Sequence, residues 1–223
     1  MQLLHMMDDW TLCLEKGGQI DAIYSDFEKA YDKIPHKRLI SKLHSYMIDE
    51  GVIKWIVNFL KAKKYRVRVN GSYSGWHNMN VTSGIPQGSV LGPILFLIYI
   101  NDLVDSCGSY CNMYIFADDA KFYRYIERPE DQEFLQLAIN ALHQWSEKWL
   151  LSLNSSKCHV VSYGRTIDTS TVYTIMDKNQ QTVSLAKIDK IKDIGVYFDA
   201  KLDFRDHYAR KINKAYNYDV RLN

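Results

Sequence analysis

Two short runs of apolar and aromatic residues meet at a pair of adjacent aspartates in the segment CNMYIFADDAKFYRYI, residues 111–126. Strand-forming runs on either side of Asp118 and Asp119 predict two short strands that meet there, because aspartate favours turns over strand interiors. An earlier segment, QIDAIYSD at residues 19–26, also reads as a short strand, and it ends in Asp26. The fold must therefore accommodate three strands with carboxylates at their ends.

The order of elements between residues 20 and 164 predicts an α+β fold. The strand at 19–26 is followed by two helical patterns after the turn IPH and by an apolar helix that begins near Pro93. The 111–126 hairpin, an amphipathic helix in PEDQEFLQLAINALHQWSEKWLLSL and a strand in KCHVVSYG come next. With one further hairpin left out, this is the β-α-β-β-α-β order of a split βαβ (ferredoxin-like) antiparallel sheet with packed helices. In that fold the first strand adjoins the hairpin, which places Asp26 beside Asp118 and Asp119.

The further hairpin follows the second helical pattern. That helix is expected to bury one stripe of residues at helical spacing, consisting of Val52, Trp55, Ile56, Phe59 and Leu60. The stretch YRVRVNG then alternates strictly, with valines on one face and Arg66 and Arg68 on the other. Asn70-Gly71 predicts a hairpin turn. Beyond residue 164 we expect strands in TVYTIM, TVSLAKI and IKDIGVYFD, and a basic helix from about Asp206.

The composition is that of a folded protein and excludes only a few broad classes. The 223 residues are 47% hydrophobic and 24% charged, as in a folded domain, and the net charge of +2 is too small to predict nucleic-acid binding without a local basic surface. The four cysteines form no disulfide or zinc framework, and no secretory signal is visible. The longest apolar run, residues 94–100, is too short to cross a membrane. These features predict a reduced intracellular protein without a membrane partner; nucleus and cytoplasm remain equally open.

The carboxylates permit two interpretations. Aspartates on adjacent strands can hold a pair of Mg²⁺ ions for an in-line phosphoryl displacement. An Asp-Asp pair at a hairpin tip is also an ordinary solvated turn. Spacing alone does not decide between a nucleotidyl transferase and a turn.

Five segments together resemble the reverse transcriptases of non-LTR (LINE-type) retrotransposons. In order, these segments are YSDFEKAYDKIPHKRLISKL, VTSGIPQGSVLGPILFLIYINDL, FADDAKFY, WLLSLNSSKCHVV and IKDIGVYFDAKLDFRDHY, which are similar to motifs A to E of that family. The resemblance implies the palm of a right-hand polymerase that uses an RNA template, a DNA primer and dNTPs. It implies the palm at 1–165, a β-hairpin and primer-grip-like region at 166–205, and the start of a thumb-like helix at 206–223.

The resemblance also implies a metal site and a proton donor. Asp26, the backbone carbonyl of Phe27, and Asp118 with its supporting neighbour Asp119 would hold two Mg²⁺ ions, with Mn²⁺ as an alternative. Lys157 resembles the motif D lysine, a general acid for the pyrophosphate leaving group; its other reading is a solvated lysine.

Three further positions resemble substrate-binding residues of the family. Tyr31 resembles the bulky gate under the sugar of the incoming nucleotide, and it otherwise reads as a core aromatic residue. Gln87 and Gly88 resemble the loop that contacts nucleotide and template, and they otherwise read as a loop into a helix.

Two departures from the family pattern bear on activity. Ala120 replaces the usual threonine after the second aspartate, and the resemblance begins just before motif A, so we expect a palm truncated at both ends. The alternatives are a catalytically silent remnant that binds at most nucleic acid, and an RNA-dependent RNA polymerase palm. Tyr31 and the FADD sequence argue against the second.

Overall fold

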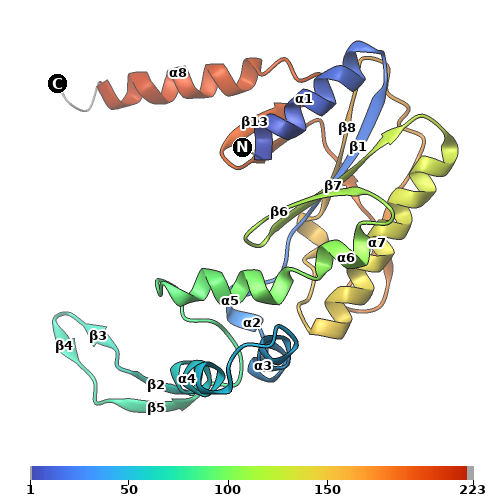
Figure 1. The fold of residues 1–223 in the computed structure, drawn as a ribbon. Coiled ribbons are helices and arrows are strands. Elements are labelled where there is room, and N and C mark those ends of the chain that lie inside the picture. The colour runs from blue at the N-terminus through green and yellow to red at the C-terminus, as the bar shows by residue number, and fades with distance from the viewer. Residues whose placement is uncertain (1, 220–223) are drawn as a thin grey trace. The chain divides into compact units, whose positions relative to one another are not determined.

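A computed structural model describes residues 2–219, which fall into two compact units (Figure 1). Unit 1 consists of the described residues up to Asp26, Cys107–Ala141, and those from Asn154 onward. Unit 2 consists of Phe27–Ser106 and Leu142–Leu153. Helix α7 (Pro129–Trp149) contributes its first part to unit 1 and its last part to unit 2.

Unit 1 is built on a five-stranded sheet in the order β11-β8-β1-β7-β6. The strands are β1 (Gln19–Ser25), β6 (Asn112–Phe116), β7 (Asp119–Ile126), β8 (His159–Tyr163) and β11 (Ala186–Lys187). Strand β1 pairs antiparallel with both β7 and β8, and β6 and β7 form a hairpin. The predicted split βαβ arrangement is confirmed, because the first strand lies between the last strand and the hairpin.

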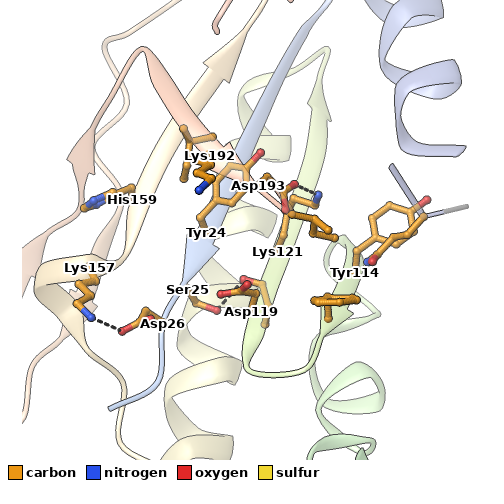
Figure 2. Close-up of a pocket in the computed structure, with 15 residues that line it drawn as sticks. Tyr24, Ser25, Asp26, Tyr114, Asp119, Lys121, Lys157, His159, Lys192 and Asp193 are labelled. Carbon is orange, nitrogen blue, oxygen red and sulfur yellow. Dashed lines mark hydrogen bonds and ion pairs between the residues drawn. The ribbon is translucent and has the colours of Figure 1, made fainter. Parts of the chain in front are cut away.

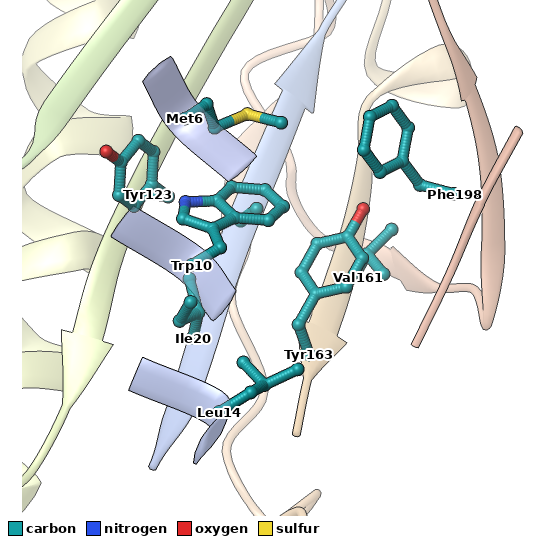
Figure 3. Close-up of a cluster of buried hydrophobic side chains, with 9 residues drawn as sticks. Met6, Trp10, Leu14, Ile20, Tyr123, Val161, Tyr163 and Phe198 are labelled. Carbon is teal, nitrogen blue, oxygen red and sulfur yellow. The ribbon is translucent and has the colours of Figure 1, made fainter. Parts of the chain in front are cut away.

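Helix α1 (Gln2–Glu15) covers the core of unit 1 (Figure 3). It buries Met6, Trp10 and Leu14, which recur every four residues and so share one face. The Trp10 ring meets the rings of Tyr123 and Tyr163 at centroid distances of 5.1 and 4.6 Å. Buried aromatic pairs of this kind contribute about 0.5–1.5 kcal/mol each beyond their buried area. This packing holds β1, β7 and β8 together beneath the helix.

The remaining strands of unit 1 form two small hairpins. Strands β9 (Thr174–Met176) and β10 (Thr182–Ser184) pair, as do β12 (Lys190–Asp193) and β13 (Val196–Asp199). The single strand expected in IKDIGVYFD is therefore wrong. The chain reverses at Ile194 and Gly195, with φ of 44° and 84°, and the strand pattern alone runs through this turn because Ile194 is apolar. A short 3₁₀ helix, η1 (Ser155–Lys157), precedes β8, and α8 (Arg205–Asp219) follows β13.

Unit 2 is mainly helical. Its helices are α2 (Ala30–Lys33), α3 (His36–Ser45), α4 (Glu50–Lys61), α5 (Leu91–Ile100) and the start of α6 (Leu103–Cys107). Between α4 and α5 the strands β2 (Ala62–Tyr65), β3 (Arg68–Val69), β4 (Ser72–Tyr73) and β5 (His77–Asn80) form two nested ladders. The Asn70-Gly71 turn is confirmed, since both residues have positive φ and β3 pairs with β4 across them.

The buried face of α4 differs from the expected stripe. Ile53, Ile56 and Leu60 are buried, whereas Val52 and Trp55 are 46% and 59% exposed. Ile56 and Leu60 of the expected stripe are therefore confirmed, whereas Val52 and Trp55 are wrong, because apolar residues occupy adjacent faces of this helix. A shift of one residue rotates a helical stripe by about 100°.

Within the described residues, no helix combines the length and the apolar character needed to cross a bilayer. All four cysteines are free thiols. The pKa values of Cys107 and Cys111 are raised to about 12, mainly because both thiols are buried.

Candidate active site

The pairing of β1 with β7 brings the predicted carboxylates to one edge of the sheet. Asp26 follows the last residue of β1, and Asp119 is the first residue of β7. Ser25 lies opposite Ala120 in the register, and its hydroxyl donates a hydrogen bond of 2.9 Å to the Ala120 carbonyl. Antiparallel strands place the end of one beside the start of the other. Carboxylates far apart in the sequence thus become neighbours (Figure 2).

A cavity of about 250 Å³ opens beside these strand ends. Its charged lining residues are Asp26, Asp119, Asp193, Lys121, Lys157 and Lys192. Tyr24, Tyr114 and His159 add aromatic side chains to the wall (Figure 2). The cavity thus combines three carboxylates with three ammonium groups, a lining suited to a ligand that carries phosphates and a cation together.

The ionised form of Asp119 is disfavoured by its surroundings. Burial raises the pKa of its carboxyl, and the nearby carboxylates of Asp118, Asp193 and Asp26 raise it further, in that order, while Lys121 lowers it. Like charges held close together disfavour ionisation of both. A bound cation would relieve this repulsion, which is the physical reason that such a cluster suits a metal ion.

The carboxylate of Asp26 is held in place by residues around η1. The Asn154 side-chain amide donates a hydrogen bond of 3.2 Å to Oδ2 of Asp26, and the Asn154 backbone N–H donates to the Asp26 carbonyl at 2.8 Å. The Nζ atom of Lys157 lies 3.7 Å from the same Oδ2. Two of the predicted catalytic residues therefore form an ion pair.

Asp118 occupies the turn between β6 and β7. Phe116 pairs with Asp119, so Ala117 and Asp118 form a two-residue turn, and Ala117 has a φ of 53°. Asp118 is half-buried and is not among the residues that line the cavity, whereas Asp119 is. The two aspartates thus play different geometric parts within one site.

A buried ion pair contributes to the lining of the cavity. Lys121 of β7 donates a hydrogen bond to the Asp193 carboxylate of β12, and the two side chains are only 5% and 8% exposed. Burial lowers the pKa of Lys121, and Asp193 opposes that effect. This pair ties the β12–β13 hairpin to the sheet that carries Asp119.

The predicted substrate-binding residues lie in unit 2. The Tyr31 ring stacks on Phe96 of α5, with a centroid distance of 4.4 Å and an interplanar angle of 18°. The Gln87 amide donates a hydrogen bond of 3.2 Å to Asp32, one residue after Tyr31. The Ile85 N–H donates to the Tyr31 carbonyl at 2.7 Å. The segment around Tyr31 and the loop at 84–88 are therefore in contact.

Gly84 makes that contact possible. Its φ is 90°, and a Cβ built there would lie 2.8 Å from the Asp32 carbonyl oxygen. Gly88 also has a positive φ, 78°, but it has open space around it. Phe27 is buried, forms a bridge with Leu153, and packs 6.0 Å from the Trp145 ring. Its side chain is thus part of the unit 2 core, and its backbone carbonyl is the group that the resemblance assigns to metal.

The donor set suits a divalent ion that shares its ligands with a substrate. Within the described residues, no group of three or more Asp, Glu, His or Cys side chains is placed to hold a metal ion. Mg²⁺ takes one or two protein carboxylates and completes its shell with water and substrate phosphates. Asp26 and Asp119 on the cavity wall, with Asp118 next to them, fit that requirement.

Among the residues that the sequence did not predict, three hold the site in place through hydrogen bonds or an ion pair: Asn154, Lys121 and Asp193. Asn154 carries the only local signal, because it lies in the same LNSSK segment as Lys157. Lys121 and Asp193 are separated by 72 residues, and no spacing rule links them. A lysine within an aromatic strand was the sole hint that Lys121 would need a buried partner.

Sequence comparison identifies the family. Residues 4–198 match the model of the family described as reverse transcriptase (RNA-dependent DNA polymerase). The chain is 28% identical over 212 residues to the "RNA-directed DNA polymerase from mobile element jockey" of Drosophila funebris, covering 92% of this chain and 22% of that protein. It is 28% identical over 225 residues to the "Probable RNA-directed DNA polymerase from transposon BS" of Drosophila melanogaster, covering 96% and 23%. The chain therefore spans less than a quarter of the length of these relatives.

Solved structures share the fold. A telomerase from Candida albicans, solved with a fragment of telomeric RNA, aligns with a TM-score of 0.62 at 12% identity, over 91% of this chain and 34% of that one. An apo telomerase from Candida tropicalis aligns with a TM-score of 0.60 at 13% identity, over 91% and 39%. Both alignments support the same α+β architecture of a polymerase palm.

Proposed function

Because this chain belongs to the reverse transcriptase (RNA-dependent DNA polymerase) family, we propose that it is the palm of a non-LTR retrotransposon RNA-directed DNA polymerase. Its substrates would be an RNA template, a DNA primer and dNTPs. The observation that supports this most strongly is the β1–β7 register, which brings Asp26 and the Asp118-Asp119 pair to one strand edge beside an open cavity.

Asp26, the Phe27 carbonyl, Asp118 and Asp119 would hold two Mg²⁺ ions. Such ions lower the pKa of the attacking 3′-hydroxyl and stabilise the leaving group in a two-metal displacement. The chain's own contribution is to fix its carboxylates before substrate arrives. The Ser25–Ala120 hydrogen bond aligns the two strands, and Asn154 orients the Asp26 carboxylate.

Lys157 would donate a proton to the pyrophosphate leaving group. Its ammonium group faces the cavity and pairs with Asp26, so it starts beside the reacting phosphates. As the bond between the α-phosphorus and the bridging oxygen breaks, negative charge grows on pyrophosphate. A positioned proton donor stabilises that charge and typically speeds such steps by about 10²- to 10⁴-fold.

Unit 2 would select the nucleotide. Tyr31, fixed by its stack on Phe96, would place a ring under the sugar and exclude a ribose 2′-hydroxyl. Gln87 and Gly88 would contact nucleotide and template from a loop whose backbone is shaped by glycines with positive φ. The contact between this loop and the Tyr31 segment supports their acting as one surface.

Primer extension on an RNA template tests the proposal. The chain should extend a DNA primer with dNTPs in Mg²⁺ or Mn²⁺, and EDTA should stop the reaction. Asp26→Asn and Asp118→Ala should reduce incorporation by about 100-fold or more, since each removes a ligand of the reacting centre.

Asp8→Asn is the matched control, because Asp8 belongs to the other Asp-Asp pair and lies exposed on α1. It should retain full incorporation. A folded wild-type chain that never extends the primer would contradict polymerase activity and favour a silent remnant. Extension that survives Asp118→Ala would contradict the metal site.

A further inference from the structure

Positive charge is concentrated in one segment of unit 2. Residues 51–101 contain six basic residues and no aspartate or glutamate; the basic residues are Lys54, Lys61, Lys63, Lys64, Arg66 and Arg68. Since the whole chain carries +2 and this segment carries +6, the other residues together carry −4. Five of the six cations fall within residues 61–68. Residues 61–68 therefore supply the local concentration of positive charge that the net charge of +2 does not reveal.

The structure presents part of this charge on a β-hairpin. We define the basic arm as residues 64–76, which include β3, β4 and the Asn70-Gly71 turn (Figure 1). The Ser74 N–H donates to the Val67 carbonyl and the Val67 N–H donates to the Ser74 hydroxyl, both at 2.9 Å. These bonds and the β3–β4 pairing define the arm's conformation. Its described side chains are exposed along its length.

Aromatic rings hold the arginines of the arm. The guanidinium carbon of Arg66 lies 3.9 Å from the centroid of the Tyr73 ring and 4.6 Å from that of Trp76. Arg68, directly opposite Tyr73 in the register, lies 5.2 Å from the same Tyr73 ring. Stacking on a ring leaves the in-plane N–H groups of a guanidinium free to donate, and these groups match phosphate oxygens in a two-pronged geometry.

The described part of the chain offers no counter-charge to the cations of the arm. Among the described side chains, no carboxylate forms an ion pair with Lys64, Arg66 or Arg68. Tyr73 and Trp76 are 51% and 62% exposed. A surface of unpaired cations interleaved with exposed rings has the two components of a single-strand platform, phosphate contacts and base stacking. Unpaired bases have free faces to stack on such rings, whereas the bases of a duplex do not.

We propose that the basic arm binds single-stranded nucleic acid, with Arg66 and Arg68 on its phosphates and Trp76 stacked on a base. The proposal rests on the proposed function, which makes nucleic acid the substrate, and it adds a second contact in unit 2 that is separate from the carboxylate cavity of unit 1. Binding at the arm does not require catalysis, so it can be measured in a chain that cannot extend a primer.

Fluorescence anisotropy tests the arm directly. The probes are a labelled 12-nucleotide single-stranded RNA and a duplex of the same length, titrated with the full chain carrying Asp118→Ala at several salt concentrations. We expect the single strand to bind more tightly than the duplex. Arg66→Ala with Arg68→Ala should weaken binding and reduce the salt slope by about 1.4, because each phosphate contact contributes about 0.7 on single strands. Trp76→Ala should weaken single-strand binding about fivefold or more with an unchanged slope.

Lys178→Ala with Lys201→Ala is the matched control, because it removes the same charge from exposed positions of unit 1. This control should change the affinity and the salt slope much less than Arg66→Ala with Arg68→Ala does. If the two double variants weakened binding equally, binding would depend on the net charge of the chain and not on the arm, and the proposal would be overturned. Tighter duplex binding, or arm variants that bind like the parent, would overturn it as well. A failure of primer extension by the wild type leaves the binding result intact, so the two proposals fail separately.

Discussion

The Nζ atom of Lys157 lies 3.7 Å from Oδ2 of Asp26, so the candidate proton donor and the candidate metal ligand form an ion pair. Lys157 lies at the end of η1 and is 67% exposed, while Asp26 follows β1. The Asn154 backbone N–H binds the Asp26 carbonyl at 2.8 Å and holds η1 against the strand end. The lysine is thereby kept at the cavity even though its side chain is largely in solvent.

Replacing Lys157 separates proton donation from charge. Lys157→Met should lower the single-turnover rate of nucleotide addition by about 100-fold, the lower range for loss of a positioned acid. Lys157→Arg keeps the positive charge but donates a proton poorly, because a guanidinium does not deprotonate in proteins. We expect Arg to rescue little of the rate. Full rescue by Arg would show that Lys157 acts only through its charge.

Tyr31 should control sugar selection. Tyr31→Ala removes the ring stacked on Phe96 and should raise ribonucleotide incorporation relative to deoxynucleotide by about tenfold or more. The measurement is the ratio of kcat/KM for a dNTP and the matching rNTP. Tyr31→Phe keeps the ring and serves as the control, with selectivity close to that of the wild type. An unchanged ratio in Tyr31→Ala would refute the gate.

Removing one partner of the Lys121–Asp193 pair should destabilise the fold strongly. Asp193→Ala leaves a buried ammonium without its partner and should lower the free energy of unfolding by about 3–5 kcal/mol in urea titration. Lys190 and Asp206 form an exposed pair for comparison, and Asp206→Ala should have a much smaller effect because solvent screens the pair. Lys121→Met with Asp193→Leu should recover most of the loss. If Asp193→Ala and Asp206→Ala lowered the free energy of unfolding by similar small amounts, the cost assigned to an unpaired, buried Lys121 would be contradicted.

Asp131 should make stability depend on acid pH. Burial opposes its ionisation, but the hydrogen bond from Arg124 and those from the backbone N–H groups of Glu127 and Arg128 lower the pKa of Asp131 overall. A lowered folded-state pKa stabilises the fold above the unfolded value near 4, and this contribution is lost as the pH falls through the folded pKa.

Asp131→Asn should therefore cost about 1 kcal/mol at pH 7 and progressively less below pH 4, measured by urea titration across pH. Glu130→Gln, at an exposed position in the same first turn of α7, is the control and should have little effect at either pH. A cost for Asp131→Asn that stays constant down to pH 2 would contradict the assignment.

Much of the unit 1 sheet could be predicted from the sequence. The strand ending at Asp26, the hairpin at Asp118-Asp119 and the intervening helices follow from periodicity, and their order selects the split βαβ arrangement. The roles of Asp26, Asp118, Asp119, Lys157, Tyr31, Gln87 and Gly88 came from family resemblance and remain predictions. Local pattern failed at α4 and at Ile194-Gly195, because apolar residues there satisfied more than one interpretation.

The sequence by itself determined the strands that meet at Asp26 and Asp118-Asp119, the Asn70-Gly71 turn and the concentration of five basic residues within 61–68, since these depend on neighbours within a few positions. Only the tertiary structure decided that Lys121 meets Asp193, that Asn154 and Lys157 hold Asp26, and that Arg66 lies over the rings of Tyr73 and Trp76. The first of these pairs spans 72 residues. Such contacts form only when several elements pack at once, and the cost of burying a charge without a partner then selects which side chains meet.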